Sequence, residues 1–208
     1  MNIPKLYKKF HVDKEHTSIG LFVALNAKYS INKVFYPGSH VHITPSLVFR
    51  EVIYADSFKN TFKFFEDPET IAFLVANKRY EEEAIFRFYQ QDYERSFEGL
   101  GNDFDLVISQ YAGFVGQAVK SYLKIGGLLV CNNSHGDASL ASLDPSYQLI
   151  AVYKRLADDK FTISAENLED YMIPKNGVLP IREDIITKRR GIAYTRSPSG
   201  YIFKKVKD

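Results

Sequence analysis

The chain has only one cysteine, Cys131, in 208 residues. A single cysteine excludes an internal disulfide framework and is compatible with a reducing compartment. The sequence also lacks an apolar run near the roughly 20 residues that a bilayer span requires. No apolar signal-peptide core follows Met1. We therefore expect a cytoplasmic protein without membrane contact.

An excess of charge of one sign is missing as well. Lys and Arg together number 27 and Asp and Glu 25, so the formal net charge is +2. Such a balance does not indicate a nucleic acid or a membrane surface as partner. With 45% hydrophobic and 25% charged residues, the composition is typical of a globular domain. No repeat or low-complexity tract divides the chain, and its length suits one domain, residues 1–208.

The sequence does contain short apolar strands that alternate with helices. Nearly continuous runs of β-branched and other apolar residues predict strands at 33–36, 51–55, 84–88, 105–109 and 128–132. Apolar residues at helical spacing predict helices at 17–30, 58–65, 71–80 and 115–123. In the second of these helices, Phe58, Phe62 and Phe65 are expected to face the core. This alternation predicts an α/β fold with a doubly wound, mostly parallel sheet.

After Pro145 the pattern changes to antiparallel pairing. Residues 147–155 and 160–165 predict one hairpin, and residues 192–196 and 201–206 predict a second. The stretch between the two hairpins is predicted to be a surface loop. We thus expect a C-terminal antiparallel hairpin on the parallel sheet.

Polar residues follow the first strands at the positions where open α/β sheets bind ligands. Gly38 and Ser39 follow Tyr36 at the end of the first strand, and a glycine there permits close approach of the backbone to a ligand. Asp56 ends the second strand 18 residues after Gly38, near the spacing at which a carboxylate binds ribose hydroxyls. Asp92, beyond the third strand, is placed to meet an adenine edge.

Over roughly residues 17–165 the chain resembles the class I S-adenosylmethionine (SAM)-dependent methyltransferases, which have a glycine-rich loop, an acid and a polar residue after strands one to three. The aspartate-led strand at 103–108 and the Gly126-Gly127 turn resemble the family's fourth and fifth strands. The hairpin at 147–165 is the candidate for its sixth and seventh, which leaves 166–208 as a C-terminal extension. The resemblance implies a Rossmann-like methyltransferase fold with S-adenosyl-L-methionine as cofactor. The implied cofactor-binding residues are Tyr36, Gly38, Ser39, Asp56, Asp92 and Gln110.

The first loop departs from the family's pattern. Tyr36 stands where the family has an acid, and His40 and His42 stand where it has further glycines. We expect Gly38→Val to abolish donor binding and His42→Gly to retain or improve it. An Asn-Pro-Pro-Tyr-type loop is also missing after the fourth strand, where residues 109–113 read Ser-Gln-Tyr-Ala-Gly. This disfavours methylation of DNA adenine or of glutamine.

Three functions remain open. The first is a methyltransferase whose unknown acceptor enters over Gln110, Tyr111 and residues 134–137. Methyl transfer needs mainly alignment of its two substrates, so no catalytic residue is assigned. The second is a non-catalytic binding or scaffold module that has lost the donor site. The third is a metal-dependent enzyme that would use side chains suited to a divalent transition metal, namely His40, His42, His135 and Asp137.

The C-terminal segment is rich in basic residues. Residues 187–208 carry seven basic side chains and one acid, interleaved with Tyr194, Tyr201 and Phe203. Such a pattern suits a nucleic-acid-binding edge. It is more often a solvated basic face over aromatic residues that pack on the core, so we expect no nucleic-acid partner.

Overall fold

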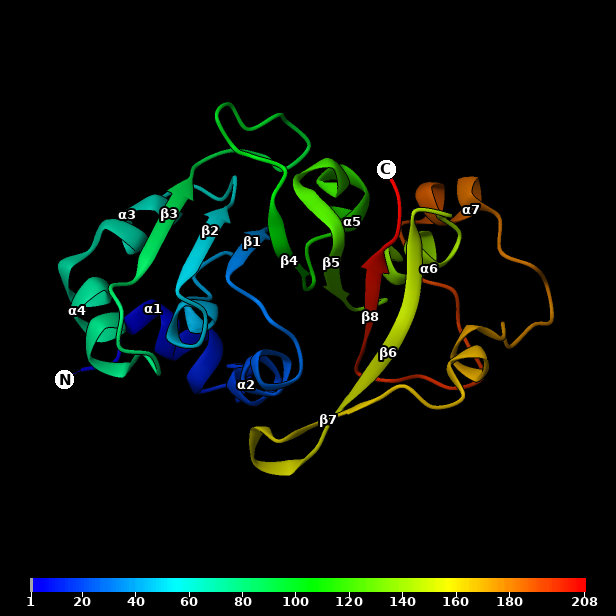
Figure 1. Ribbon diagram of the computed structural model, residues 1–208, viewed down its shortest axis with the longest axis horizontal. Coiled ribbons are helices and arrows are strands. Elements are labelled where there is room, and N and C mark those ends of the chain that lie inside the picture. The colour runs from blue at the N-terminus through cyan, green and yellow to red at the C-terminus, as the bar shows by residue number, and fades with distance from the viewer. Residues whose placement is uncertain (1) are drawn as a thin grey trace.

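A computed structural model describes residues 2–208, which form an eight-stranded sheet covered by helices (Figure 1). The strand order is β3-β2-β1-β4-β5-β8-β6-β7. The parallel strands are β1 (Lys33–Pro37), β2 (Glu51–Ala55), β3 (Ile85–Tyr89), β4 (Phe104–Ser109) and β5 (Leu123–Cys131). The strands whose pairings are all antiparallel are β6 (Tyr147–Arg155), β7 (Phe161–Ser164) and β8 (Gly200–Lys205). This order confirms the predicted doubly wound, mostly parallel sheet of the Rossmann-like methyltransferase type.

Alternating side chains of the strands build a core on each face of the sheet. In β1, Val34 and Tyr36 belong to one core and Phe35 to the other. Three helices cover the first face, namely α2 (Ile19–Lys28), α3 (Thr61–Glu66) and α4 (Pro68–Asn77). The second face is covered by α5 (Val115–Ala118) and α6 (Asp137–Ser142). Two further short helices, α1 (Lys5–Tyr7) and α7 (Arg182–Lys188), each add a buried residue.

The direction of β6 decides what meets at one edge of the sheet. β8 is antiparallel to both β5 and β6, so β6 runs parallel to β5. The carboxyl ends of β1, β2, β4, β5 and β6 therefore reach the same edge. Residues at the end of β6 are thus brought beside those that follow β1 and β4.

The predicted second hairpin is wrong. Residues 192–196 form no strand, and Tyr194 makes only an isolated bridge with Pro174. β8 instead lies in the sheet between β5 and β6. The strands of this one sheet therefore come from nearly the whole chain, between residues 33 and 205. Its side chains are apolar on both faces, with Ile202 in one core and Phe203 in the other, as a central strand requires. The hairpin of β6 and β7 is confirmed, but β7 lies at the sheet's margin and β8 is the neighbour of β5.

The predicted helix at 115–123 is much shorter than expected. It consists of α5 and a 3-10 turn, Lys120–Tyr122, and β5 already begins at Leu123. Gly126 and Gly127 therefore lie inside the strand and do not precede it. Gly126 has a φ of +86°, and the pairing of β4 with β5 shifts register beside it. A glycine at a bulge explains how the strand continues through this pair.

Phe58 and Phe62 were expected in the core and are not. Asn60 adopts a left-handed conformation with a φ of +72°, so α3 begins only at Thr61. Phe65 is buried, but Phe58 is 63% exposed and Phe62 is 36% exposed. Phe58 lies in the loop after β2, at the edge of the sheet where ligands bind in this fold class.

None of the helices built from residues 2–208 combines the length and the apolar composition that crossing a bilayer demands.

Candidate functional site

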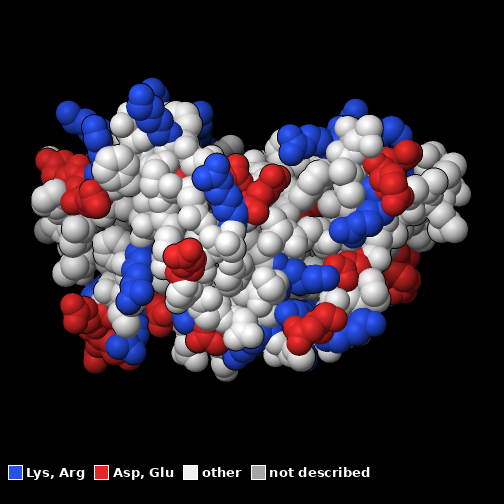
Figure 2. Space-filling model, turned by 90° about the horizontal axis from the view of Figure 1, so that it is seen from above, with Lys and Arg blue, Asp and Glu red and all other residues white. Residues whose placement is uncertain are grey.

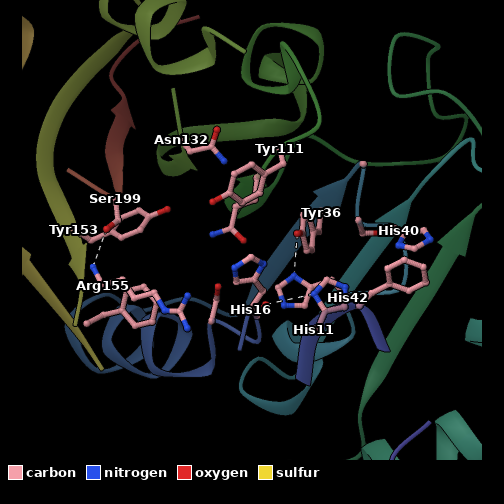
Figure 3. A pocket seen from close by; sticks show the side chains of 16 residues that line it. His11, His16, Tyr36, His40, His42, Tyr111, Asn132, Tyr153, Arg155 and Ser199 are labelled. Carbon is pink, nitrogen blue, oxygen red and sulfur yellow. Dashed lines mark hydrogen bonds between the residues drawn. The ribbon is translucent and has the colours of Figure 1, made fainter. Parts of the chain in front are cut away.

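A cavity of about 430 Å³ opens at the carboxyl edge of the sheet (Figure 3). This volume falls within the range of roughly 300–1,000 Å³ that is usual for small-molecule sites. It lies between the ends of β1, β4, β5 and β6 and the N-terminal segment, and we name it the main cavity. Its wall consists of Phe10, His11, His16, Ser18, Tyr36, Gly38, Ser39, His40, His42, Gln110, Tyr111, Asn132, Tyr153, Arg155, Phe161 and Ser199.

A second cavity of about 330 Å³ adjoins the main cavity over the end of β2, and we name it the side cavity. Its wall consists of Gly38, His40, Asp56, Ser57, Phe58, Tyr93, Tyr111 and Ala112. Three residues line both cavities and so separate them, namely Gly38, His40 and Tyr111. All three have a positive φ, of +67°, +46° and +61° in that order.

The loop after β1 has the positive φ angles that glycines usually provide, although Gly38 is followed by His40 at the second such position. His40 takes the left-handed conformation that glycine adopts readily, at a cost of roughly 1–2 kcal/mol for another residue. Gly38 cannot be replaced at so little cost, because a Cβ atom there would lie 2.2 Å from the Cβ atom of Ala112. The loops after β1 and β4 therefore touch at this point, and only glycine permits the contact.

Asp56 joins the loops after β1 and β2. One carboxylate oxygen accepts the N–H of His40 at 2.7 Å, and the other accepts the N–H of Phe58 at 2.7 Å. Each carboxylate oxygen can accept a further hydrogen bond, so Asp56 can still receive hydroxyls in the side cavity. The N–H groups of Gly38 and Ser39 both donate to the Ala55 carbonyl. The backbone donors of this loop are thus used within the protein.

His42 is a neutral structural residue in the wall of the main cavity. Its Nε2 donates to the Thr17 carbonyl at 2.8 Å, since a carbonyl can only accept. Its Nδ1 therefore accepts from the Tyr36 hydroxyl at 3.0 Å. Figure 3 shows the Tyr36 side chain directed at His42. The two residues hold each other, and Tyr36 has none of the charge that the family's acid would bring to this position.

Burial, together with the stacked imidazole of His11 at 4.2 Å, lowers the pKa of His42 to about 3. Because the unfolded histidine has a pKa near 6.5, the unfolded chain binds a proton below pH 6.5 that folded His42 does not. The free energy of unfolding should therefore decrease as the pH is lowered. This residue contributes about 2 kcal/mol to the decrease between neutral pH and pH 5. Urea unfolding across this range checks the slope. An equally steep slope in His42→Asn would contradict it.

Unpaired polar atoms gather in the main cavity. Over residues 2–208, six buried side-chain atoms have no hydrogen-bond partner. Three of them belong to this wall, namely Ser39 Oγ, His11 Nε2 and Asn132 Nδ2. Asn132 is only 9% exposed, and its amide nitrogen is directed toward the cavity in Figure 3. Because buried polar groups are normally paired, this cluster points to a polar ligand.

The structure brings together all but one of the residues that the sequence assigns to the cofactor. The main cavity takes Tyr36, Gly38, Ser39 and Gln110, and Asp56 lies in the side cavity. Asp92 is exposed outside both cavities, where its Oδ1 accepts the N–H of Glu94 at 2.9 Å. It forms a turn, and its neighbour Tyr93 lines the side cavity instead.

The proposed metal ligands are not brought together. Across the described residues, no group of three or more His, Cys, Asp or Glu side chains is arranged to hold a metal ion. Both nitrogens of His42 are bonded within the protein, and His135 is exposed. Asp137 is buried and accepts hydrogen bonds from Ser109 Oγ at 2.5 Å and from the Gly116 N–H. The arrangement gives the metalloenzyme hypothesis no support.

Several wall residues escaped the sequence analysis. Phe58 was assigned to the core, and His11 belongs to a π-helical turn, Lys8–Val12, that was not predicted. Tyr153 and Arg155 lie at the end of β6, and only the strand order places them at this edge. Asn132 follows β5 directly, so a search for polar residues after every strand end would have found it.

The basic C-terminal segment does not form a single-sign surface. Lys205 is buried, and its Nζ donates to the carbonyls of Lys120 and Leu123. Arg196 pairs with Asp170 at 2.7 Å. Tyr194, Tyr201 and Phe203 pack in the core, as expected. Figure 2 shows basic and acidic side chains interspersed over the face in view.

No known family model matches the chain, and no curated protein does. Among solved structures, it is similar to a SAM-dependent methyltransferase from Clostridium acetobutylicum ATCC 824, with 12% identity over 97% of this chain and 96% of that one and a TM-score of 0.47. An rRNA methylase from Streptococcus thermophilus shares 8% identity over 92% and 96%, with a TM-score of 0.47.

The N-methyltransferase NodS from Bradyrhizobium japonicum WM9, solved in complex with S-adenosyl-L-homocysteine, shares 13% identity over 78% of this chain and 90% of that one, with a TM-score of 0.45. These likenesses are weak and concern the fold alone. The fold assignment therefore rests on the strand order and on the helices over both faces.

Proposed function

We propose that the chain is a SAM-dependent methyltransferase that acts on a small molecule in the cytoplasm. The observation that carries this proposal is the placement of Asp56 in the side cavity beside three aromatic side chains, those of Phe58, Tyr93 and Tyr111. The carboxylate suits ribose hydroxyls. The aromatic rings, of which Phe58 is largely exposed, suit the flat face of an adenine.

The other end of the donor fits the main cavity beside Gly38. Because the N–H groups of this loop are already bonded, side chains must bind the amino-acid end of SAM. Ser39 Oγ and Asn132 Nδ2, two of the three unpaired groups in this wall, are available for it. When bound, SAM supplies a methyl group on a positively charged sulfur. The Tyr36 and Tyr111 rings in the same wall suit a cation.

The chain's own contribution is alignment and exclusion of water. The N-terminal segment covers the main cavity with Phe10 and His11, and it is fixed by the Tyr7 hydroxyl on Thr44 Oγ1 at 2.7 Å. Gln110, predicted to contact the cofactor, lies in the wall between the ends of β1 and β5. A methyl acceptor held there would need little more than orientation toward the donor.

A second function is favoured by one observation, the contact between Gly38 and Ala112. This contact belongs to the partition between the cavities, so a donor that spans both must pass over it or part the loops. A non-catalytic binding module that uses the main cavity alone needs neither. In that case S-adenosylhomocysteine would not bind, while a small polar ligand of the main cavity would.

Asp56→Asn tests the methyltransferase proposal. The variant should bind S-adenosylhomocysteine tenfold to a hundredfold more weakly than the wild type, because a hydrogen bond to a charged group contributes about 1.5–3 kcal/mol. Calorimetric titration measures the affinity.

Asp92→Asn is the matched control, since Asp92 also accepts a backbone N–H but lies outside both cavities. It should bind S-adenosylhomocysteine like the wild type. Equal affinity in the Asp56 variant would remove Asp56 from the site, and a loss in both variants would show that the effect is not local.

A further inference from the structure

The main cavity has an uneven charge. Among the described residues, none that lines it is Asp or Glu, and Arg155 is its only Lys or Arg. In Figure 3 the guanidinium of Arg155 lies at one end of the cavity, across from Tyr36 and His40. A cation without an acid in the same wall suits an anionic ligand.

Arg155 is held in place from three sides. Its backbone N–H donates to Ser199 Oγ at 2.9 Å, and one guanidinium nitrogen donates to the Glu15 carbonyl. Its Nε lies 3.9 Å from Asp159 Oδ1, and the other oxygen of Asp159 is bonded to Thr17 Oγ1 and the Ile19 N–H. These contacts leave further N–H groups of the guanidinium fork free for a ligand.

His11, His42 and Tyr153, which line the same wall, carry no charge near neutral pH. Burial lowers the pKa of His11 to about 4 and that of His42 to about 3, so neither imidazole is charged near neutral pH. Burial raises the pKa of the Tyr153 hydroxyl, which therefore keeps its proton. Asn132 adds an unpaired amide nitrogen. None of these three side chains competes with Arg155 for an anion, and the carboxylate of Asp159, 3.9 Å from its Nε, does not line the cavity.

The strand order separates Arg155 from the proposed adenosine site. Asp56 follows β2 and Arg155 ends β6, which lie five strand spacings apart in the order β2-β1-β4-β5-β8-β6. At about 4.8 Å per spacing this is roughly 24 Å. Arg155 is therefore at the end of the site away from the donor's adenosine, where a second molecule would enter.

We propose that the methyl acceptor is a small, planar, largely apolar molecule with one anionic group, and that Arg155 binds this group. The inference rests on the proposed function. The planar body is suited to Phe161 and Tyr153, since Phe161 pairs with Arg155 across the β6–β7 hairpin and the two rings lie 6.1 Å apart in the cavity wall. A carboxylate and a phosphate share the chemistry that the guanidinium fork recognises.

Three probes of similar size test the proposal, namely benzoate, phenyl phosphate and the neutral benzamide. Titrations followed by NMR should show the wild type binding at least one anion roughly tenfold more tightly than benzamide. The better anion identifies the group. In Arg155→Gln, the ratio of the affinity for the anion to that for benzamide should fall close to one, and Arg155→Lys should restore part of the preference. Arg95→Gln, at an exposed arginine outside both cavities, should leave the ratio unchanged.

Equal affinity for benzamide and both anions would overturn the proposal, and so would an anion preference that survives in Arg155→Gln. Thermal unfolding confirms that each variant is folded, and Arg155→Lys provides the test if the glutamine variant is not. S-adenosylhomocysteine is titrated in parallel. If it fails to bind the wild type while the anion preference depends on Arg155, the methyltransferase function fails and the anion site stands.

Discussion

His42→Gly is expected to lower the free energy of unfolding by about 3–5 kcal/mol, a large share of the stability of a domain. The imidazole is only 3% exposed, and its removal leaves a cavity against His11 and Phe22. It also leaves the Tyr36 hydroxyl and the Thr17 carbonyl without their partner. An unpaired buried polar group costs about 1–3 kcal/mol.

The prediction drawn from the sequence concerned donor binding alone, and the stability cost follows from the contacts of the imidazole in the structure. Urea unfolding of His42→Gly and of His16→Ala checks it, since His16 lines the same cavity but is exposed. The His16 variant should stay within about 0.5 kcal/mol of the wild type. A His42 variant as stable as the wild type would show that the imidazole does not tie the loop to Thr17.

Gly38→Val is expected to destabilise the protein by about 2–5 kcal/mol and to abolish binding of S-adenosylhomocysteine. A φ of +67° costs a β-branched residue roughly 1–2 kcal/mol or more. The added Cβ atom would also lie 2.2 Å from that of Ala112, and overpacking of this kind costs about 1–3 kcal/mol. Denaturant unfolding and calorimetric titration measure the two effects.

The contribution of the contact is separated from that of the backbone by a second substitution. In Gly38→Ala, the clash is with the Ala112 side chain, so adding Ala112→Gly should recover the part due to overpacking and not the part due to φ. No recovery would mean that the two loops do not meet at this point. Full recovery would mean that the left-handed backbone costs nothing.

The sequence predicted correctly those strands whose bounds are set by neighbouring residues. β2 matches its predicted bounds, because four consecutive apolar residues, 52–55, end at an acidic turn. The Gly126-Gly127 pair misled the prediction, since a glycine that ends a helix and a glycine at a bulge look alike in sequence. The position of β8 beside β5 depends on pairing between residues 70 or more apart, which no local pattern contains.

The candidate site was predictable where it follows a strand end. Gly38, Ser39 and Asp56 were found because each follows a strand whose carboxyl end reaches the ligand edge. Asp92 meets the same criterion and is only a turn residue, since a strand end does not say which way a side chain points. Arg155 and His11 lie 144 residues apart in the sequence, and only the tertiary structure brings them to this edge.

The central claim is that one donor molecule occupies both cavities, and calorimetric titration of the wild type with S-adenosylhomocysteine and with adenosine tests it most directly. We expect one S-adenosylhomocysteine per chain, bound at least tenfold more tightly than adenosine, because Ser39 and Asn132 in the main cavity offer polar groups that adenosine cannot reach. Absence of S-adenosylhomocysteine binding at millimolar concentration, or binding no tighter than that of adenosine, would contradict the claim.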